Sequence, residues 1–303
     1  MILDNLFPIF ALLGAGVVLK RFDLTGEAFL KRSDRLVYFF FFPSLLFWKI
    51  GGAPIPRQES LNYCLIPLFA VVGVFFLGLI LVRILSMESY RVGSFSQSTY
   101  RFNTYLGMAV VASSLGEEGI RYFGLLVSMA IPVINLLAVS VLIWFSGKSY
   151  SAGERVRLAG RAVLTNPLIL ACLFGIAYAN AFSRFPAFVD NTFRLITSAA
   201  LPLALLSIGG ALTFGSLRRY LTPALLASAI KLAVLPLVGY VLLRYFRVVG
   251  LPFRVAMIFL CLPTAPAIYV LSSQLNSDTD LASASIALST VFSFLSLSVA
   301  LLL

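Results

Sequence analysis

Apolar runs about as long as a membrane span alternate along the whole chain with short polar segments. Ten such runs, each free or nearly free of charge, cover 6–19, 36–48, 61–82, 92–115, 122–145, 162–183, 195–217, 221–243, 255–275 and 281–303. A spanning helix needs roughly 20 mainly apolar residues. The pattern therefore predicts an all-α integral membrane protein with about ten transmembrane helices. The second run is short, and the long side chains of Arg35 and Lys49 extend it to membrane thickness.

The composition excludes a soluble domain. Of the 303 residues, 60% are hydrophobic and only 12% are charged, whereas soluble domains carry roughly 25% charged residues. The net charge of +11 does not indicate nucleic-acid binding, because such binders concentrate basic residues on a soluble face or arm. Here the basic residues lie in short loops between apolar runs, so the lipid bilayer is the expected partner.

The distribution of Lys and Arg among the loops predicts the orientation. The odd-numbered connections hold thirteen of these residues and the even-numbered connections hold eight. Because cytoplasmic loops carry the excess of basic residues, the odd connections are expected in the cytoplasm. Both termini then lie outside, and we expect a multi-pass protein of a bacterial cytoplasmic (inner) membrane.

An internal repeat is visible when the chain is compared with itself at an offset of 159 residues. Pairs of Pro or Gly residues coincide: Pro8 with Pro167, Gly16 with Gly175, Pro43 with Pro202 and Gly51 with Gly210. This predicts two five-helix repeats, 1–146 and 161–303, joined by a cytoplasmic linker, 147–160. An odd number of spans per repeat forces an inverted topology, which is typical of secondary transporters.

The fourth and ninth spans are interrupted by polar, Gly or Pro residues at nearly equivalent positions. The candidate binding residues there are Asn103, Thr104 and Gly107 in span four and Pro263, Thr264 and Pro266 in span nine. Proline removes helical hydrogen bonds, and unwound backbone at membrane depth has to face protein or a cavity. We therefore expect broken helices that line a substrate site. The alternative is that the prolines only kink a helix and that Asn103 serves an interhelical contact.

Two cations inside spans are further candidates, because a buried ion is costly and usually marks a pathway or a partner. Lys231 lies at the midpoint of span eight, and Arg101 lies two residues before Asn103. No Asp or Glu lies in the central part of any span, so these cations favour an anionic substrate. The alternatives are that Arg101 reaches the cytoplasmic surface, and that Lys231 is neutral or held by carbonyls of a broken span.

The chain lacks the residues of common enzymatic and metal sites. It has no His, and its three cysteines, Cys64, Cys172 and Cys261, show no metal-binding spacing. Without buried acid–base or nucleophile pairs, we expect neither an enzyme nor a cofactor. Sodium could still bind carbonyls and hydroxyls such as those of Thr104 and Thr264, so sodium or proton coupling stays open.

Several segments together resemble the auxin efflux carrier family over essentially the full chain. They are LVYFFFFPSLLF (36–47), RFNTYLG (101–107), TNPLILACLFGIA (165–177), ALPLALLSIGGAL (200–212) and LPTAPAIYVLSSQLN (262–276). The resemblance implies two inverted five-helix repeats, with spans 1, 2, 6 and 7 as a scaffold. Spans 3–5 and 8–10 would form a mobile transport domain in which the broken helices four and nine cross.

The family commonly forms homodimers that move organic anions such as auxin, malate or malonate by an elevator-like motion. Asn103 and Thr104 match its Asn-Thr in the first crossover, and Pro266 with Ala267 matches its Pro-Ala in the second. The chain departs from the plant members in having Phe102 before Asn103 where they place a proline, and in its short central linker. Auxin specificity is therefore not carried over.

The leading hypothesis is a secondary transporter of a small organic anion. Asn103, Thr104 and the segment 263–266 would line its site, and Lys231 or Arg101 would supply positive potential. One alternative is a sodium-coupled symporter of the bile-acid type, which has a similar fold. Another is a membrane sensor that binds a ligand without transporting it.

Overall fold

The computed structural model describes residues 2–52, 60–147, 151–182, 184–215 and 217–303, and all of its regular elements there are helices. In chain order they are α1 (Ile2–Arg21), α2 (Glu27–Leu36), η1 (Val37–Phe41), α3 (Phe42–Gly51), α4 (Ser60–Ile84), α5 (Ser89–Tyr100), α6 (Thr104–Phe145), α7 (Ala152–Leu164), α8 (Pro167–Ala181), α9 (Ala187–Ser198), α10 (Ala200–Ala211), α11 (Leu217–Ala229), η2 (Ile230–Val234), α12 (Leu235–Tyr245), α13 (Gly250–Cys261), α14 (Ala267–Gln274) and α15 (Thr279–Leu302). The prediction of an all-α protein is confirmed.

Six helical stretches of the described chain are long and apolar enough to cross a membrane. They are Ile2–Arg21, Asn62–Ile84, Ser89–Phe145, Ala187–Ala211, Leu217–Tyr245 and Thr279–Leu302, and Pro167–Ala181 and Gly250–Cys261 are shorter apolar helices. The stretch Ser89–Phe145 covers both the fourth and the fifth expected span, and it turns at Gly116, where φ is +63°. Multi-pass membrane character is therefore supported, and the count of ten stays a prediction.

Two helices contain a π-helical turn, and both turns precede a proline. The turn η1 ends two residues before Pro43, and η2 ends two residues before Pro236. A proline has no N–H to donate and its ring crowds the preceding turn, so the helix accommodates it by widening locally. The second of these turns contains Lys231.

The start of the expected sixth span lies later than the apolar run indicates. That run begins at 162, whereas α7 continues to Leu164 and α8 starts only at Pro167. Asn166 sets this boundary, because its Oδ1 accepts hydrogen bonds from the amides of Leu168 (2.9 Å) and Ile169 (3.3 Å). A proline at the first position of a helix reinforces such a cap. Apolarity alone therefore misplaces the helix start.

Close helix pairs hold the first and second halves of the chain together. Helix α1 packs on α10, and α3 packs on α8. Glycines make the α1–α10 approach possible: a Cβ on Gly16 would lie 2.3 Å from the carbonyl oxygen of Leu206, and one on Gly209 would lie 2.0 Å from that of Leu13. Small residues commonly allow this contact between membrane helices.

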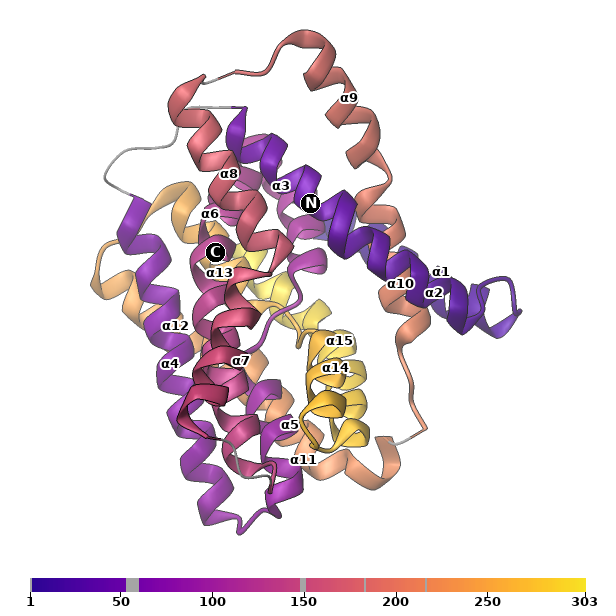
Figure 1. The fold of residues 1–303 in the computed structure, drawn as a ribbon, viewed down its shortest axis with the longest axis vertical. Helices are drawn as coiled ribbons and strands as arrows, with labels where there is room; N and C mark the ends of the chain where they lie inside the picture. Colours follow the sequence, from indigo (N-terminus) through magenta and orange to yellow (C-terminus); the bar gives the residue numbers. More distant parts are fainter. Residues whose placement is uncertain (1, 53–59, 148–150, 183, 216) are drawn as a thin grey trace.

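The remaining long helices form a second group around the interrupted segments. Helix α4 packs against α5 and α12, α13 packs against α12 and α15, and α11 packs along α15. Figure 1 shows α4 and α12 side by side along one edge, while α1, α2, α9 and α10 lie toward the other. The helices α5, α6 and α13 lie between these regions, and α5 carries five of the buried polar residues, Ser94, Ser96, Gln97, Ser98 and Thr99.

Candidate functional site

Two helices are interrupted where the sequence predicts breaks. Helix α5 ends at Tyr100 and α6 begins at Thr104, which leaves residues 101–103 non-helical. Helix α13 ends at Cys261 and α14 begins at Ala267, with residues 262–266 between them. The interruption of spans four and nine is thus confirmed. It leaves backbone groups free for other bonds.

The two interruptions meet and bond to each other. The amide of Asn103 donates to the carbonyl oxygen of Pro263 (2.9 Å). The hydroxyl of Thr264 donates to the carbonyl oxygen of Ser98 (2.8 Å), and the amide of Thr264 donates to Oγ of Ser289 on α15 (3.1 Å). Two hydrogen bonds thus join the broken helices to each other, and the Thr264 amide joins the second of them to α15. We call residues 101–104 and 262–266 the crossing.

Asn103 caps α6 and keeps an unused donor. Its Oδ1 accepts from the amides of Tyr105 (3.1 Å) and Leu106 (3.2 Å). Its Nδ2 has no hydrogen-bond partner among the described residues, although the residue is only 1% exposed. A buried N–H group without a partner costs free energy, so an acceptor that arrives there would be stabilised.

Lys231 is fully buried, and its amine contacts the crossing through the backbone. In an unbroken helix the carbonyl of Leu260 would accept from the amide of Thr264, but that amide bonds to α15. The Leu260 carbonyl instead accepts from Nζ of Lys231 at 3.0 Å. The sequence left open whether Lys231 is held by carbonyls of a broken span. The structure shows one such bond, to the Leu260 carbonyl.

Arg101 is the second buried cation of the crossing, and both of its side-chain partners are neutral. Its guanidinium donates to Oε1 of Gln97 (3.3 Å) and to Oδ1 of Asn135 on the second part of α6 (3.1 Å). The residue is 8% exposed, so it does not extend into water. In the described part of the chain, its guanidinium is hydrogen-bonded to two amide oxygens and paired with no carboxylate.

Gly107 and the remaining candidates shape the crossing. A Cβ on Gly107 would lie 2.4 Å from Cζ of Phe123 and 2.5 Å from Cδ1 of Leu262, so only glycine allows this packing without displacement. Pro263 is buried, whereas Thr104 and Pro266 are half-buried at the starts of α6 and α14. The structure thus brings Asn103 and Pro263 into contact, packs Gly107 against Leu262 and bonds Lys231 to the Leu260 carbonyl.

Sequence reasoning missed the residues that hold the cations and the crossing. Gln97 and Ser98 lie in α5, Asn135 lies in the second part of α6, and Ser289 lies in α15; all are less than 9% exposed. An amide such as Asn135 within an otherwise apolar run was the available signal, since polar residues in spans usually face a partner. The pattern separates the two spans at 116–121, near the turn at Gly116, but it does not show which residue Asn135 meets across that turn.

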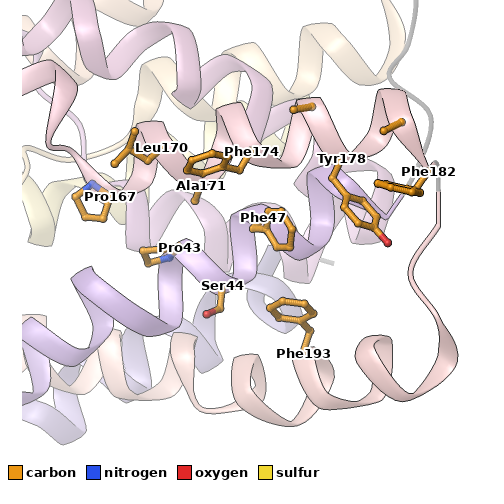
Figure 2. A pocket seen from close by; sticks show the side chains of 12 residues that line it. Pro43, Ser44, Phe47, Pro167, Leu170, Ala171, Phe174, Tyr178, Phe182 and Phe193 are labelled. Carbon is orange, nitrogen blue, oxygen red and sulfur yellow. The ribbon is translucent and has the colours of Figure 1, made fainter.

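An apolar groove of about 770 Å³ lies away from the crossing, between α3, α8 and α9. Figure 2 shows Phe47 of α3, Tyr178 of α8 and Phe193 of α9 converging near one end, where the Phe47 ring centroid lies 5.8 Å from that of Tyr178 and 5.6 Å from that of Phe193. Its lining contains no charged residue. The crossing, with its two buried cations, is therefore the stronger candidate for an anion site.

Comparison with known proteins agrees with this architecture. A family model described as "Membrane transport protein" matches residues 1–301. An uncharacterized transporter of Methanothermobacter thermautotrophicus is 27% identical over 305 residues, covering 97% of this chain and 95% of its own. An uncharacterized transporter of Methanocaldococcus jannaschii is 22% identical over 300 residues, covering 97% and 96%. The chain belongs to this membrane transport protein family, the auxin efflux carrier family.

Proposed function

We propose that the protein is a secondary transporter of a small organic anion. The observation that carries the proposal is the meeting of two interrupted helices beside two buried cations. Neither Arg101 nor Lys231 has a carboxylate partner among the described residues. Because an uncompensated charge at membrane depth is costly, a carboxylate ligand would relieve it.

The crossing also supplies neutral donors for such an anion. Helices α6 and α14 both begin there, and the N-terminal end of a helix carries positive partial charge. The free Nδ2 of Asn103 adds a directed hydrogen-bond donor. In this proposal the carboxylate lies near Asn103 and Thr104, and Arg101 supplies the nearest full positive charge.

Packing supports the inverted repeat that such a carrier would use. At the offset of 159, Gly16 corresponds to Gly175 and Gly51 to Gly210. In the α1–α10 pair, a Cβ on Gly16 would lie 2.9 Å from the amide nitrogen of Gly210; in the α3–α8 pair, one on Gly51 would lie 3.5 Å from the carbonyl oxygen of Gly175. Each half thus contributes one helix to each pair, as a two-fold relation between the halves requires.

These pairs would form the scaffold of an elevator. In this proposal α1, α3, α8 and α10 stay fixed, because their close glycine contacts hold them together. The helices α4–α6 and α11–α15 carry the crossing across the membrane. The excess of basic residues in the odd connections supports a cytoplasmic linker and outward termini. A homodimer through the scaffold would hold it in place.

Replacing Lys231 by methionine tests whether the lysine takes part. Methionine keeps much of the side-chain length but removes the amine that bonds to the Leu260 carbonyl. An unsatisfied buried acceptor costs about 1–3 kcal/mol. We therefore expect a lower melting temperature and, since the lysine contacts the crossing, uptake that is slower by about fivefold or more. Normal uptake by folded Lys231→Met would remove the lysine from the mechanism.

An ion pair joins the proposed scaffold to the proposed mobile part. Nζ of Lys49, near the end of α3, lies 2.8 Å from Oε1 and 2.6 Å from Oε2 of Glu117, which follows the turn at Gly116. Glu117 is exposed, and exposed pairs contribute up to about 1 kcal/mol. We expect Glu117→Lys to lower the population of this conformation by up to about fivefold.

Distances between spin labels would measure that population. Exposed Phe40 and Leu136 can be changed to cysteine, since the three native cysteines are buried. Glu117→Lys should shift the distance distribution, and adding Lys49→Glu should restore it. An unchanged distribution in the single variant would show that the pair does not hold this conformation.

Uptake by purified protein in liposomes tests the proposed function. The substrates are a panel of labelled dicarboxylates and an aromatic monocarboxylate, each with and without sodium or proton gradients. Saturable uptake of one anion supports the proposal, and its gradient dependence identifies the coupling ion. Strict sodium dependence with a bulky amphipathic anion would favour the bile-acid type of symporter. Binding without uptake would favour a sensor.

A further inference from the structure

A second groove of about 680 Å³ lies between α4 and the end of α6, and none of the residues of the crossing lines it. Apolar side chains line most of it, including Phe76 and Ile80 of α4 and Val141 of α6. Phe76 and Ile80 are each 56% exposed, so the groove opens outward. Its volume is within the range of ligand sites.

One end of this groove is cationic. Arg83 lies in the last turn of α4 and lines the groove together with Ser86. Its side chain is exposed and has no ion pair or hydrogen bond among the described residues. A free guanidinium offers several donors in a plane that matches a phosphate.

The position of Arg83 along the chain favours the phosphate of a lipid headgroup over a soluble phosphate. Arg83 belongs to the third connection, one of the odd connections that the excess of basic residues places in the cytoplasm. Trp144 lines the same end and is 73% exposed, and tryptophan favours the membrane–water interface. We therefore expect the cation at headgroup level, with the apolar walls extending from it toward the membrane interior.

We propose that this groove binds one anionic phospholipid of the cytoplasmic leaflet. The phosphate pairs with Arg83, and an acyl chain lies along Phe76, Ile80 and Val141. A lipid matches the size of the groove, its apolar walls and the unpaired cation at one end. A small soluble anion would contact the cation but would not bury the apolar walls. The site requires that the protein lies in a bilayer with its odd connections in the cytoplasm, and it does not depend on the transport proposal.

Tryptophan fluorescence can test the site directly, because the chain has only two tryptophans. In a Trp48→Phe background, Trp144 is the sole emitter. The protein is reconstituted in phosphatidylcholine with a small fraction of brominated phosphatidylglycerol or brominated phosphatidylcholine. We expect the phosphatidylglycerol to quench with about fivefold higher apparent affinity, as one cation near the surface provides.

Two arginine variants separate the groove from general attraction to the basic surface. Arg83→Gln should remove the preference for phosphatidylglycerol. Arg218→Gln should keep it, because Arg218 is equally exposed and belongs to another odd connection, but lies on α11. Soluble glycerol phosphate should not compete. Equal quenching by both lipids, a preference that survives Arg83→Gln, or competition by glycerol phosphate would overturn the proposal.

Discussion

Arg101→Gln is expected to abolish uptake of the transported anion while the protein remains folded. The substitution removes the buried positive charge two residues before Asn103 and keeps a polar side chain of smaller size. Loss of one partner from a buried charged contact typically costs about 2–5 kcal/mol, so uptake at low substrate concentration should fall by at least about 30-fold. Gln97 and Asn135 lose a donor but stay neutral, which limits the loss of stability.

Two matched variants show whether charge at this position is responsible. Arg101→Lys keeps the charge but cannot reach both amide oxygens at once, so we expect an intermediate rate. Arg244→Gln removes an exposed cation in the last turn of α12 and should transport normally. If Arg101→Gln transports at the wild-type rate, the buried arginine does not attract the substrate.

Gly209→Ala is expected to prevent stable folding of the α1–α10 pair. The added Cβ would lie 2.0 Å from the carbonyl oxygen of Leu13, and real Cβ contacts stay above 3.0 Å. The obstacle is backbone, so no side-chain rotation relieves it and the two helices have to separate. Overpacking of side chains alone costs about 1–3 kcal/mol, and we expect this backbone clash to cost more.

The melting temperature in detergent and the yield of monodisperse protein would show the effect. Gly14→Ala, on α1 itself, is the matched control, because a Cβ there meets nothing within 4 Å. The control should behave as wild type, since alanine also favours a helix more than glycine does. A Gly209→Ala protein as stable as the control would contradict the close α1–α10 contact.

The breaks at the crossing could be predicted because their causes are local. Pro263 and Pro266 cannot donate helical hydrogen bonds, and Asn103 is a strong capping residue. The partners across the crossing could not be predicted, because they depend on which freed carbonyl lies near which donor. The Leu260 carbonyl, whose helical donor would be the Thr264 amide, accepts from Lys231 while that amide bonds to Ser289.

The presence of helices could be predicted better than the residues at which they begin and end. Apolarity shows that a segment can enter the membrane but not where its helix starts, so the cap at Asn166 and the turns before Pro43 and Pro236 were not anticipated. The reversal at Gly116 depends on a positive φ, which glycine permits and does not require. The ion pair from Lys49 to Glu117 follows from that reversal.

Counterflow in sealed proteoliposomes tests the central claim most directly. Vesicles are loaded with the unlabelled anion that shows saturable uptake. Entry of a trace amount of the same anion in labelled form is then measured without any ion gradient. A carrier that alternates around the crossing predicts transient accumulation of label above equilibrium, lost in Arg101→Gln and retained in Arg244→Gln. Label that only equilibrates, or counterflow that is unaffected by Arg101→Gln, would contradict the account.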